Sequence, residues 1–309
     1  MTFGTNRREF IAAASAVTAI SALGGNAAAA QGPMPRRPIP STGEMLPVVG
    51  LGGSKVISQI SENGAEPVAA VLRALRARGG SVVDTWPRDA TDDAGLGRVL
   101  AEPDLRDSLF VTTKVHVTGR QAGIEQFRQT QRLYGRRTLD LAQVFSLTDL
   151  DTHWPSLMDW KAAGDARYIG VTVSRYDLYE PLEAFLQRET PDFVQLNYSI
   201  TERRAEQRLL PMAADLGLAV LINRPFMNGT YFDLLEDVRL PDWTAQFDCR
   251  SWAQFSLKYI LAHPAVTCVL TETSNPAHMD ENAGTAFGRM PDEAAKARMR
   301  RYIDNVRTY

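Results

Sequence analysis

Eight short runs of apolar and β-branched residues alternate with longer amphipathic segments along most of the chain. The runs are Val48 to Leu51, Val82 to Asp84, Leu109 to Thr113, Leu141 to Leu147, Tyr168 to Val173, Phe193 to Asn197, Leu218 to Ile222 and Val266 to Leu270. Continuous apolar strands separated by helices are typical of a parallel sheet that is covered on both faces. Eight such units in a chain of this length favour a closed (β/α)8 TIM barrel over an open doubly wound sheet. No G-x-G-x-x-G turn follows the first run, which counts against a Rossmann domain.

The segments between these runs have helical periodicity. In EPVAAVLRALRARGG, the apolar residues Val68, Val71, Leu72 and Leu75 fall on one face, and the pair Gly79-Gly80 indicates the end of the helix. TERRAEQRLLPMAADLG and CRSWAQFSLKYILAHP show a similar pattern. We therefore expect helices on the outside of the barrel.

Polar residues stand at the C-terminal ends of the predicted strands. They are Asp84, Lys114, Thr172, Gln195, Asn223 and Thr271, with Asp89 and His116 just beyond. Active sites of (β/α)8 barrels form at this face, and packing does not require inward-facing charges there. The pattern therefore predicts a functional site at the barrel mouth.

The first thirty residues have the pattern of an export signal. Arg7 and Arg8 precede the uncharged run Ile11 to Leu23, and small residues follow at Ala28 to Ala30. The run is too short to span a bilayer, and the arginine pair with Phe10 resembles a twin-arginine signal. We therefore predict a signal peptide over residues 1–30, recognition by the export machinery, a periplasmic location and no stable membrane anchor.

The stretch that follows, residues 31–45, is rich in proline and predicts a tether. The barrel is then expected to span residues 46–309. The formal net charge is −2, and acidic and basic residues are interleaved. Because no basic stripe is present to neutralise a phosphate backbone, a nucleic acid partner is not expected.

Cys249 and Cys268 are the two cysteines of the chain. In an exported protein they could form a disulfide, and the sequence leaves their pairing open. Their spacing is not that of a metal site. Asp92, Asp93 and His153, taken with Asp89 and His116, also lack recognisable ligand spacing, so we predict no metal.

Several sequence blocks resemble those of the aldo-keto reductase family and occur in its order. They are VVDT followed by GLGRVL, LFVTTK, RTLDLAQVFSLTDLDTHWPSLMDWKAAGDARYIGVT, DFVQLNYS, LINRPF and SNPAHMDENAG. The resemblance implies a barrel that binds a nicotinamide cofactor in extended form and passes hydride to a carbonyl carbon. It also implies a small-molecule carbonyl or alcohol substrate.

The resemblance implies four catalytic positions, of which this sequence keeps two. Asp84 matches the aspartate and Lys114 the lysine, whereas Asp89 replaces the tyrosine that protonates the alkoxide. Phe145 replaces the histidine that polarises the carbonyl. General acid catalysis contributes about 10² to 10⁴ in rate, and a donor to the oxyanion about 10² to 10³. The set is thus degenerate, and its proton chemistry must differ.

Two residues are candidates for moving the proton. Asp89 is expected to be an anion at neutral pH. The pKa of an aspartate carboxyl is about 3.9, and a lysine beside it lowers that pKa further. Asp89 could then act as a base, or merely pair with Lys114 or lie in a solvated loop. His116, two residues past Lys114 on an extended segment, would share its face and could supply the missing donor; the alternative is a histidine that is satisfied elsewhere or faces solvent. Trp86 and Phe145 are expected to line the substrate pocket.

The resemblance also implies residues that bind the dinucleotide. Gln195 and Thr172 match positions that hold the nicotinamide carboxamide, whereas Asn223 stands where the family often has a tyrosine. Arg224 could contact a phosphate. The remaining candidates, around the adenosine, are Glu272, Thr273, His278, Glu281 and Asn282. Glu272 would repel a ribose 2′-phosphate but can accept a hydrogen bond from a free 2′-hydroxyl, which favours NAD over NADP.

Three hypotheses of function remain at this stage. The first is an NAD(P)-dependent oxidoreductase with altered proton chemistry. The second is a barrel that has lost catalysis and binds a small molecule or a protein, and the chain could then carry no nicotinamide cofactor. The third is a lyase or isomerase that uses Asp89 as a base beside Lys114 and turns over without a cofactor.

Overall fold

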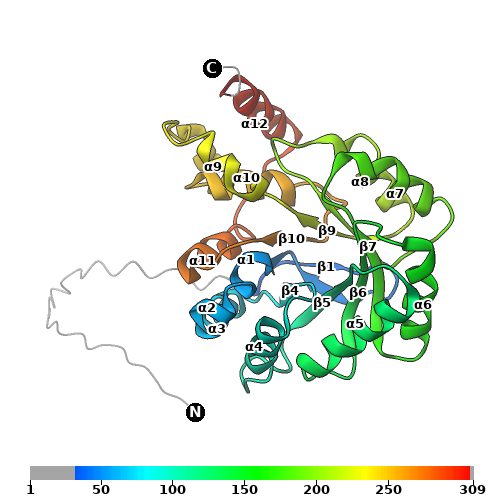
Figure 1. Ribbon diagram of the computed structural model, residues 1–309. Coiled ribbons are helices and arrows are strands. Elements are labelled where there is room, and N and C mark those ends of the chain that lie inside the picture. The colour runs from blue at the N-terminus through cyan, green and yellow to red at the C-terminus, as the bar shows by residue number, and fades with distance from the viewer. Residues whose placement is uncertain (1–31, 307–309) are drawn as a thin grey trace, which may run out of the picture. The chain divides into compact units, whose positions relative to one another are not determined.

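The computed structural model describes residues 32–306, and eight parallel strands close a barrel in the order β10-β3-β4-β5-β6-β7-β8-β9 (Figure 1). The strands are β3 (Val49–Gly52), β4 (Val82–Asp84), β5 (Phe110–Val115), β6 (Leu139–Phe145), β7 (Ala166–Thr172), β8 (Phe193–Asn197), β9 (Ala219–Asn223) and β10 (Cys268–Thr271). The predicted (β/α)8 barrel is confirmed. The predicted strand through Leu147 ends at Phe145 instead, because Ser146 and Leu147 have φ values of 51° and 56°, outside the extended region.

Helices cover the outside of the barrel (Figure 1). They are α1 (Ser54–Ile57), α2 (Ile60–Asn63), α3 (Glu66–Ala77), α4 (Ala90–Leu100), α5 (Arg120–Leu133), α6 (Leu150–Ala162), α7 (Tyr179–Leu186), α8 (Leu209–Asp215), α9 (Thr230–Asp233), α10 (Trp252–Leu261), α11 (Pro276–Gly284) and α12 (Glu293–Val306). Short 3-10 segments are η1 (Tyr176–Leu178), η2 (Arg204–Glu206), η3 (Met227–Gly229) and η4 (Asp242–Phe247). The predicted apolar face of α3 is buried, and the chain leaves the helix at Gly79, whose φ is 88°.

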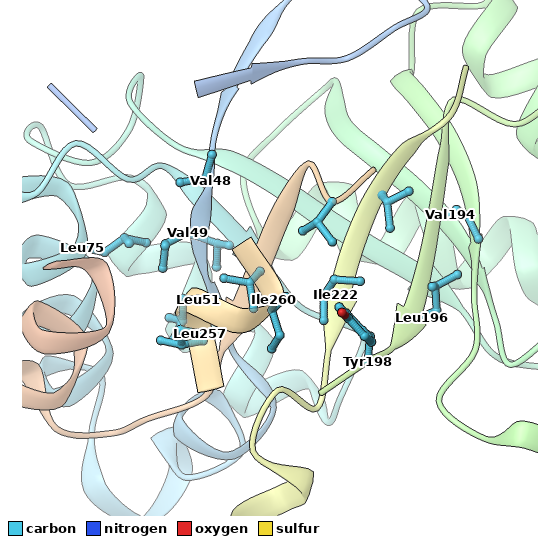
Figure 2. Packing of buried hydrophobic residues seen from close by; sticks show 14 of the residues in the cluster. Val48, Val49, Leu51, Leu75, Val194, Leu196, Tyr198, Ile222, Leu257 and Ile260 are labelled. Atoms are coloured by element: carbon cyan, nitrogen blue, oxygen red, sulfur yellow. The ribbon is translucent and has the colours of Figure 1, made fainter. Parts of the chain in front are cut away.

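Two apolar cores hold the barrel. The outer one joins the outward faces of the strands to the helices, and Figure 2 shows Leu257 and Ile260 of α10 beside Leu51 of β3. The inner one fills the barrel and includes Phe110, Tyr168 and Phe193. Each fully buried large apolar side chain stabilises the fold by about 1.5 to 3 kcal/mol. The packed interior leaves the strand ends as the place for a site.

An antiparallel hairpin, β1 (Arg36–Pro38) and β2 (Met45–Pro47), packs against the end of the barrel at which the strands begin. Ile39 and Leu46 belong to the inner core, and Arg37 donates hydrogen bonds to the carbonyls of Leu261, His263 and Val266. The predicted tether and the domain start at residue 46 are therefore wrong. The folded unit begins at Pro33, because the prolines of this stretch flank apolar residues that the barrel interior buries. The predicted signal peptide lies outside the described residues.

Cys249 and Cys268 are both buried free thiols, so they do not form the disulfide that the sequence left open. Cys268 lies inside the barrel, and its burial raises the pKa of its thiol above the usual range. Between Gly32 and Val306, no three acidic, histidine or cysteine side chains are grouped so as to hold a metal ion. No helix in that range has the length and apolarity needed to cross a membrane.

Candidate active site

A cavity of about 350 Å³ opens at the C-terminal ends of the strands. The predicted site residues that line it are Asp84, Trp86, Lys114, Phe145, Thr172, Gln195, Asn223, Arg224 and Glu272. Because inward-facing positions of parallel strands converge at the barrel mouth, side chains distant in sequence meet there. The structure therefore brings these predicted residues into one site.

A second cavity of about 450 Å³ lies beside the first. Phe226, Phe232 and Glu272 line both. The second is also lined by Ser251, Trp252, Ala253, Thr273, His278, Glu281 and Asn282. The two cavities share these three residues, and their linings extend from the barrel mouth to α11; we refer to the two together as the groove.

Asp84 and Lys114 form a buried ion pair at the bottom of the first cavity. Lys114 Nζ lies 2.7 Å from Asp84 Oδ1 and donates to the Thr85 carbonyl at 2.9 Å. Asp84 Oδ1 also accepts from Thr112 Oγ1 at 2.6 Å. Burial lowers the pKa of Lys114, and the neighbouring carboxylate of Asp84 opposes that effect. The pair is thus fixed in position, with a lysine that is more acidic than usual.

Asp89 is not part of this site. Its side chain is exposed and caps the N-terminus of α4, where Oδ1 accepts from the backbone N–H of Thr91 at 2.9 Å and of Asp92 at 3.0 Å. These backbone donors hold the pKa of Asp89 below its usual value. The structure contradicts a proton-transfer role of Asp89 and its pairing with Lys114; of the alternatives, the solvated position comes nearest, with the carboxylate engaged as the cap of α4.

His116 lies outside the cavity lining as well. Its ring nitrogens are 3.2 and 3.3 Å from Gln126 Nε2, and its ring centroid is 6.4 Å from that of Trp86 and 6.5 Å from that of Phe145. Trp86 and Phe145 pack edge to face at 4.8 Å. His116 thus packs beside an aromatic pair, does not line the cavity and makes no hydrogen bond to Lys114, so the structure does not support it as the missing donor.

Arg88 is a cavity residue that the sequence reasoning missed. Its guanidinium lines the first cavity and lies 5.5 Å from the Trp86 ring centroid. It directly precedes the position at which the resemblance places a tyrosine. No periodicity distinguishes Arg88 from a surface arginine; its position beside the tyrosine site was the one available signal.

Two polar side chains, the buried Gln195 and the half-buried Asn223, line the first cavity with unsatisfied hydrogen-bonding atoms. Gln195 is 1% exposed, and neither atom of its amide has a partner among residues 32–306. Asn223 donates from Nδ2 to the Val173 carbonyl, while its Oδ1 has no partner there. Buried polar groups normally have partners, and convergent polar groups in a cavity are typical of ligand sites. Gln195 and Thr172, both on the lining, fit a carboxamide.

Arg224 holds an uncommon backbone conformation at the groove. Its φ is 53°, its Nη1 donates to the Ser174 carbonyl at 2.8 Å, and its buried Nε has no partner in the described chain. Non-glycine residues in the left-handed region often mark functional sites. An anionic group in the groove would fit this guanidinium.

The second cavity has acidic character at its junction with the first. Glu272 Oε1 accepts from the backbone N–H of Lys55 at 2.7 Å. Among the described residues, no lysine or arginine lines this second cavity. Thr273, His278, Glu281 and Asn282 are thus brought together on the lining of the second cavity, while Lys55, the neighbour of Glu272, lines the first cavity only.

The fold matches solved aldo-keto reductase structures. The holo form of AKR11C1 from Bacillus halodurans has a TM-score of 0.70 at 19% identity and covers 88% of this chain and 96% of its own. A Klebsiella pneumoniae aldo-keto reductase in complex with NADPH gives 0.69 at 20%, covering 84% and 92%. The glycerol dehydrogenase AKR11B4 from Gluconobacter oxydans gives 0.69 at 19%, covering 88% and 94%. At these identities the likeness establishes the fold.

A search of curated protein sequences finds no match. The aldo/keto reductase family model, by contrast, matches residues 48–298. That range includes the barrel from its first strand into α12 and every residue of both cavities. The chain therefore belongs to the aldo/keto reductase family.

Proposed function

We propose that this protein is a nicotinamide-dependent oxidoreductase that interconverts a carbonyl and an alcohol, with Lys114 as the group that moves the proton. The observation that carries the proposal is the juxtaposition, in one cavity, of the unpartnered Gln195 amide and the Asp84–Lys114 pair. The family membership supports it, as does the NADPH complex of the Klebsiella pneumoniae relative.

Gln195 and Thr172 would hold the carboxamide of the nicotinamide, and Arg224 a phosphate. Glu281 and Asn282, on α11, would contact the adenine end of the groove. When bound, the cofactor supplies or accepts the hydride. The protein contributes position and charge, which are its usual part in cofactor chemistry.

Lys114 would transfer the proton because no tyrosine and no histidine of the described chain line the first cavity. Asp84 and the Thr85 carbonyl engage two of the three ammonium protons, which leaves one for an oxygen in the cavity. In reduction the ammonium donates this proton to the alkoxide; in oxidation the neutral amine accepts it from the alcohol. Burial lowers the pKa of Lys114, which makes the ammonium a better proton donor and the neutral amine easier to form than in an exposed lysine.

The preference for NAD over NADP is part of the same proposal. Glu272 lines both cavities, and its carboxylate would repel a ribose 2′-phosphate bound beside it. No lysine or arginine of residues 32–306 lines the second cavity to balance that charge. A carboxylate instead suits a free 2′-hydroxyl. Export to the periplasm, through the signal in residues 1–30, also remains part of this proposal.

The hypothesis of a lyase or isomerase loses its base, because Asp89 caps α4 outside both cavities.

The experiment that tests the oxidoreductase proposal has two stages. Titration of the purified protein with NADH should quench the fluorescence of the cavity residue Trp86, and the absence of quenching at millimolar NADH would overturn the proposal. Turnover of a panel of aldehydes, ketones and alcohols should then be lost in Lys114→Met. Cofactor binding without turnover of any substrate would favour the barrel that has lost catalysis.

A further inference from the structure

Arg88 connects two loops at the cavity wall. Its Nη1 donates to Thr85 Oγ1 at 3.0 Å and to the Trp86 carbonyl at 2.9 Å, both in the loop after β4. Its Nη2 donates to the carbonyls of Gly53 and Ser54, at 3.3 and 2.8 Å, in the segment between β3 and α1. Nε donates to Ser58 Oγ. All five N–H groups of the guanidinium are thus engaged, and the side chain bridges these two loops.

All five donors of Arg88 meet uncharged oxygens. The nearest bonded carboxylate, Asp93 Oδ2, accepts from the backbone N–H of Arg88 at 3.0 Å and not from the guanidinium. Burial lowers the pKa of Arg88, but an arginine stays charged at any physiological pH. The cavity wall therefore carries a cation that no ion pair holds.

Thr85 links Arg88 to Lys114. The Thr85 carbonyl accepts from Lys114 Nζ at 2.9 Å, and the Thr85 N–H donates to Thr112 Oγ1 at 3.3 Å. The same Thr112 hydroxyl donates to Asp84 Oδ1. Arg88, by holding the Thr85 hydroxyl and the next carbonyl, fixes the backbone on which one of the ammonium contacts of Lys114 depends.

We propose that Arg88 is the positioning residue for Lys114: it clamps the Thr85 backbone that orients the ammonium, and it places a second positive charge at the cavity wall. This inference rests on the proposed function, in which Lys114 moves the proton. A geometry error near one ångström is enough to lower a rate about 10²-fold, so a clamp on the lysine acceptor has a direct effect on turnover.

The charge of Arg88 has a separate consequence. The charged groups that act on Lys114 are Asp84, from β4, and Arg88, from the following loop, while β6 places the uncharged Gln143 opposite it. A like charge favours loss of the lysine proton. Arg88 therefore acts with burial to make the Lys114 ammonium a stronger acid, and against the carboxylate of Asp84.

The test uses side-chain NMR of the five lysines, with the Lys114 signal assigned by Lys114→Met. Arg88→Gln should shift the titration midpoint of Lys114 to higher pH, Arg88→Lys should leave it close to that of the native protein, and Arg98→Gln on the exposed side of α4 should not move it. A Lys114 midpoint that is the same in Arg88→Gln and the native protein would overturn the inference. This readout needs no substrate, so it separates the inference from the proposed function.

Turnover gives the second measurement, at a temperature well below the unfolding midpoint of each variant. Arg88→Lys keeps the charge but cannot reach all five acceptors, so kcat should fall at least about tenfold while the dissociation constant for NADH stays unchanged. A loss of thermal stability with kcat intact would show a merely structural arginine and contradict the clamp. Turnover of Arg88→Lys can be measured even if Arg88→Gln does not fold.

Discussion

Lys114 Nζ and Asp84 Oδ1 lie 2.7 Å apart on neighbouring strands, and their side chains are only 5% and 13% exposed. Such a pair is costly to desolvate, and removing one partner leaves an uncompensated charge. Its burial at the bottom of a cavity that no tyrosine or histidine of residues 32–306 lines is what the proposed proton transfer by Lys114 requires. Packing alone would be served as well by apolar residues.

The rate of carbonyl reduction should fall as pH rises through the pKa of Lys114. Because the ammonium is the proton donor and burial lowers this pKa, the alkaline limb should begin below the pH expected for an ordinary lysine. In the direction of alcohol oxidation, the rate should rise over the same interval. Lys114→Arg keeps the charge but does not titrate, so it should be slow and lack this limb. A limb that persists in Lys114→Arg would contradict the assignment.

Gln195→Leu should weaken NADH binding without loss of stability. The amide of Gln195 is buried and makes no hydrogen bond within the described residues. Its removal should therefore be neutral or stabilising, since an unsatisfied buried polar group costs about 1 to 3 kcal/mol. Loss of the carboxamide contacts should raise the dissociation constant for NADH about tenfold, as measured by fluorescence titration beside thermal unfolding.

Gln143 offers the matched control. It is also fully buried with an unpartnered amide, but it does not line either cavity. Gln143→Leu should change stability in the same direction and leave NADH affinity unaltered. Equal effects of both substitutions on affinity would show that Gln195 does not contact the cofactor.

The strands of the barrel and half of the site follow from the sequence. Apolar runs between helical segments identify all eight strands, and Asp84 and Lys114 stand at the ends of two of them. The hairpin could not be found this way, because β1 and β2 have three residues each and include prolines. What makes them a hairpin is burial of Ile39 and Leu46 inside a barrel built from later residues.

Asp89 was misplaced for a different physical reason. Matching positions by sequence locates the Cα of a residue but not the direction of its side chain. Here the chain begins α4 at Ala90, and the Asp89 carboxylate turns to the free N–H groups of that helix. The preceding side chain, Arg88, faces the cavity instead. The first cavity is therefore lined by the cation of Arg88 and not by the anion of the next residue, Asp89.

Replacement of Asp89 separates its structural role from catalysis. Asp89→Asn keeps a good helix cap and should preserve both turnover and stability, whereas Asp89→Ala should lower the unfolding midpoint by a few degrees. The pKa of Asp89 is lower in the folded protein than in the unfolded chain, so its stabilisation is present above the unfolded pKa and is lost as pH falls through the folded one. Loss of turnover in Asp89→Asn would restore a catalytic role.

Glu272→Lys should change the choice of dinucleotide. A lysine at the junction of the cavities would place a cation where a 2′-phosphate is expected, so the affinity for NADPH relative to NADH should rise about tenfold or more. Glu272→Gln removes only the repulsion and should give a smaller change. Competition titrations with the two cofactors measure the ratio. If Glu272→Lys leaves the ratio unchanged, the ribose does not lie beside residue 272.

Arg37→Met should destabilise the protein without altering the site. Arg37 donates to the carbonyls of Leu261, at the end of α10, and of His263 and Val266, just after it, and so fixes the hairpin to the barrel. Since hydrogen bonds from a charged donor contribute about 1.5 to 3 kcal/mol each at most, the free energy of unfolding should fall by about 2 to 4 kcal/mol. The adjacent Arg36 is exposed and bonds only the Met45 carbonyl across the hairpin, so Arg36→Met should cost less than about 1 kcal/mol. Urea unfolding measures both variants.

NADH affinity should match that of the native protein in both Arg37→Met and Arg36→Met, because the hairpin lies at the opposite end of the barrel from the groove. Equal stability of the two variants would mean that the hairpin is held by its apolar residues alone.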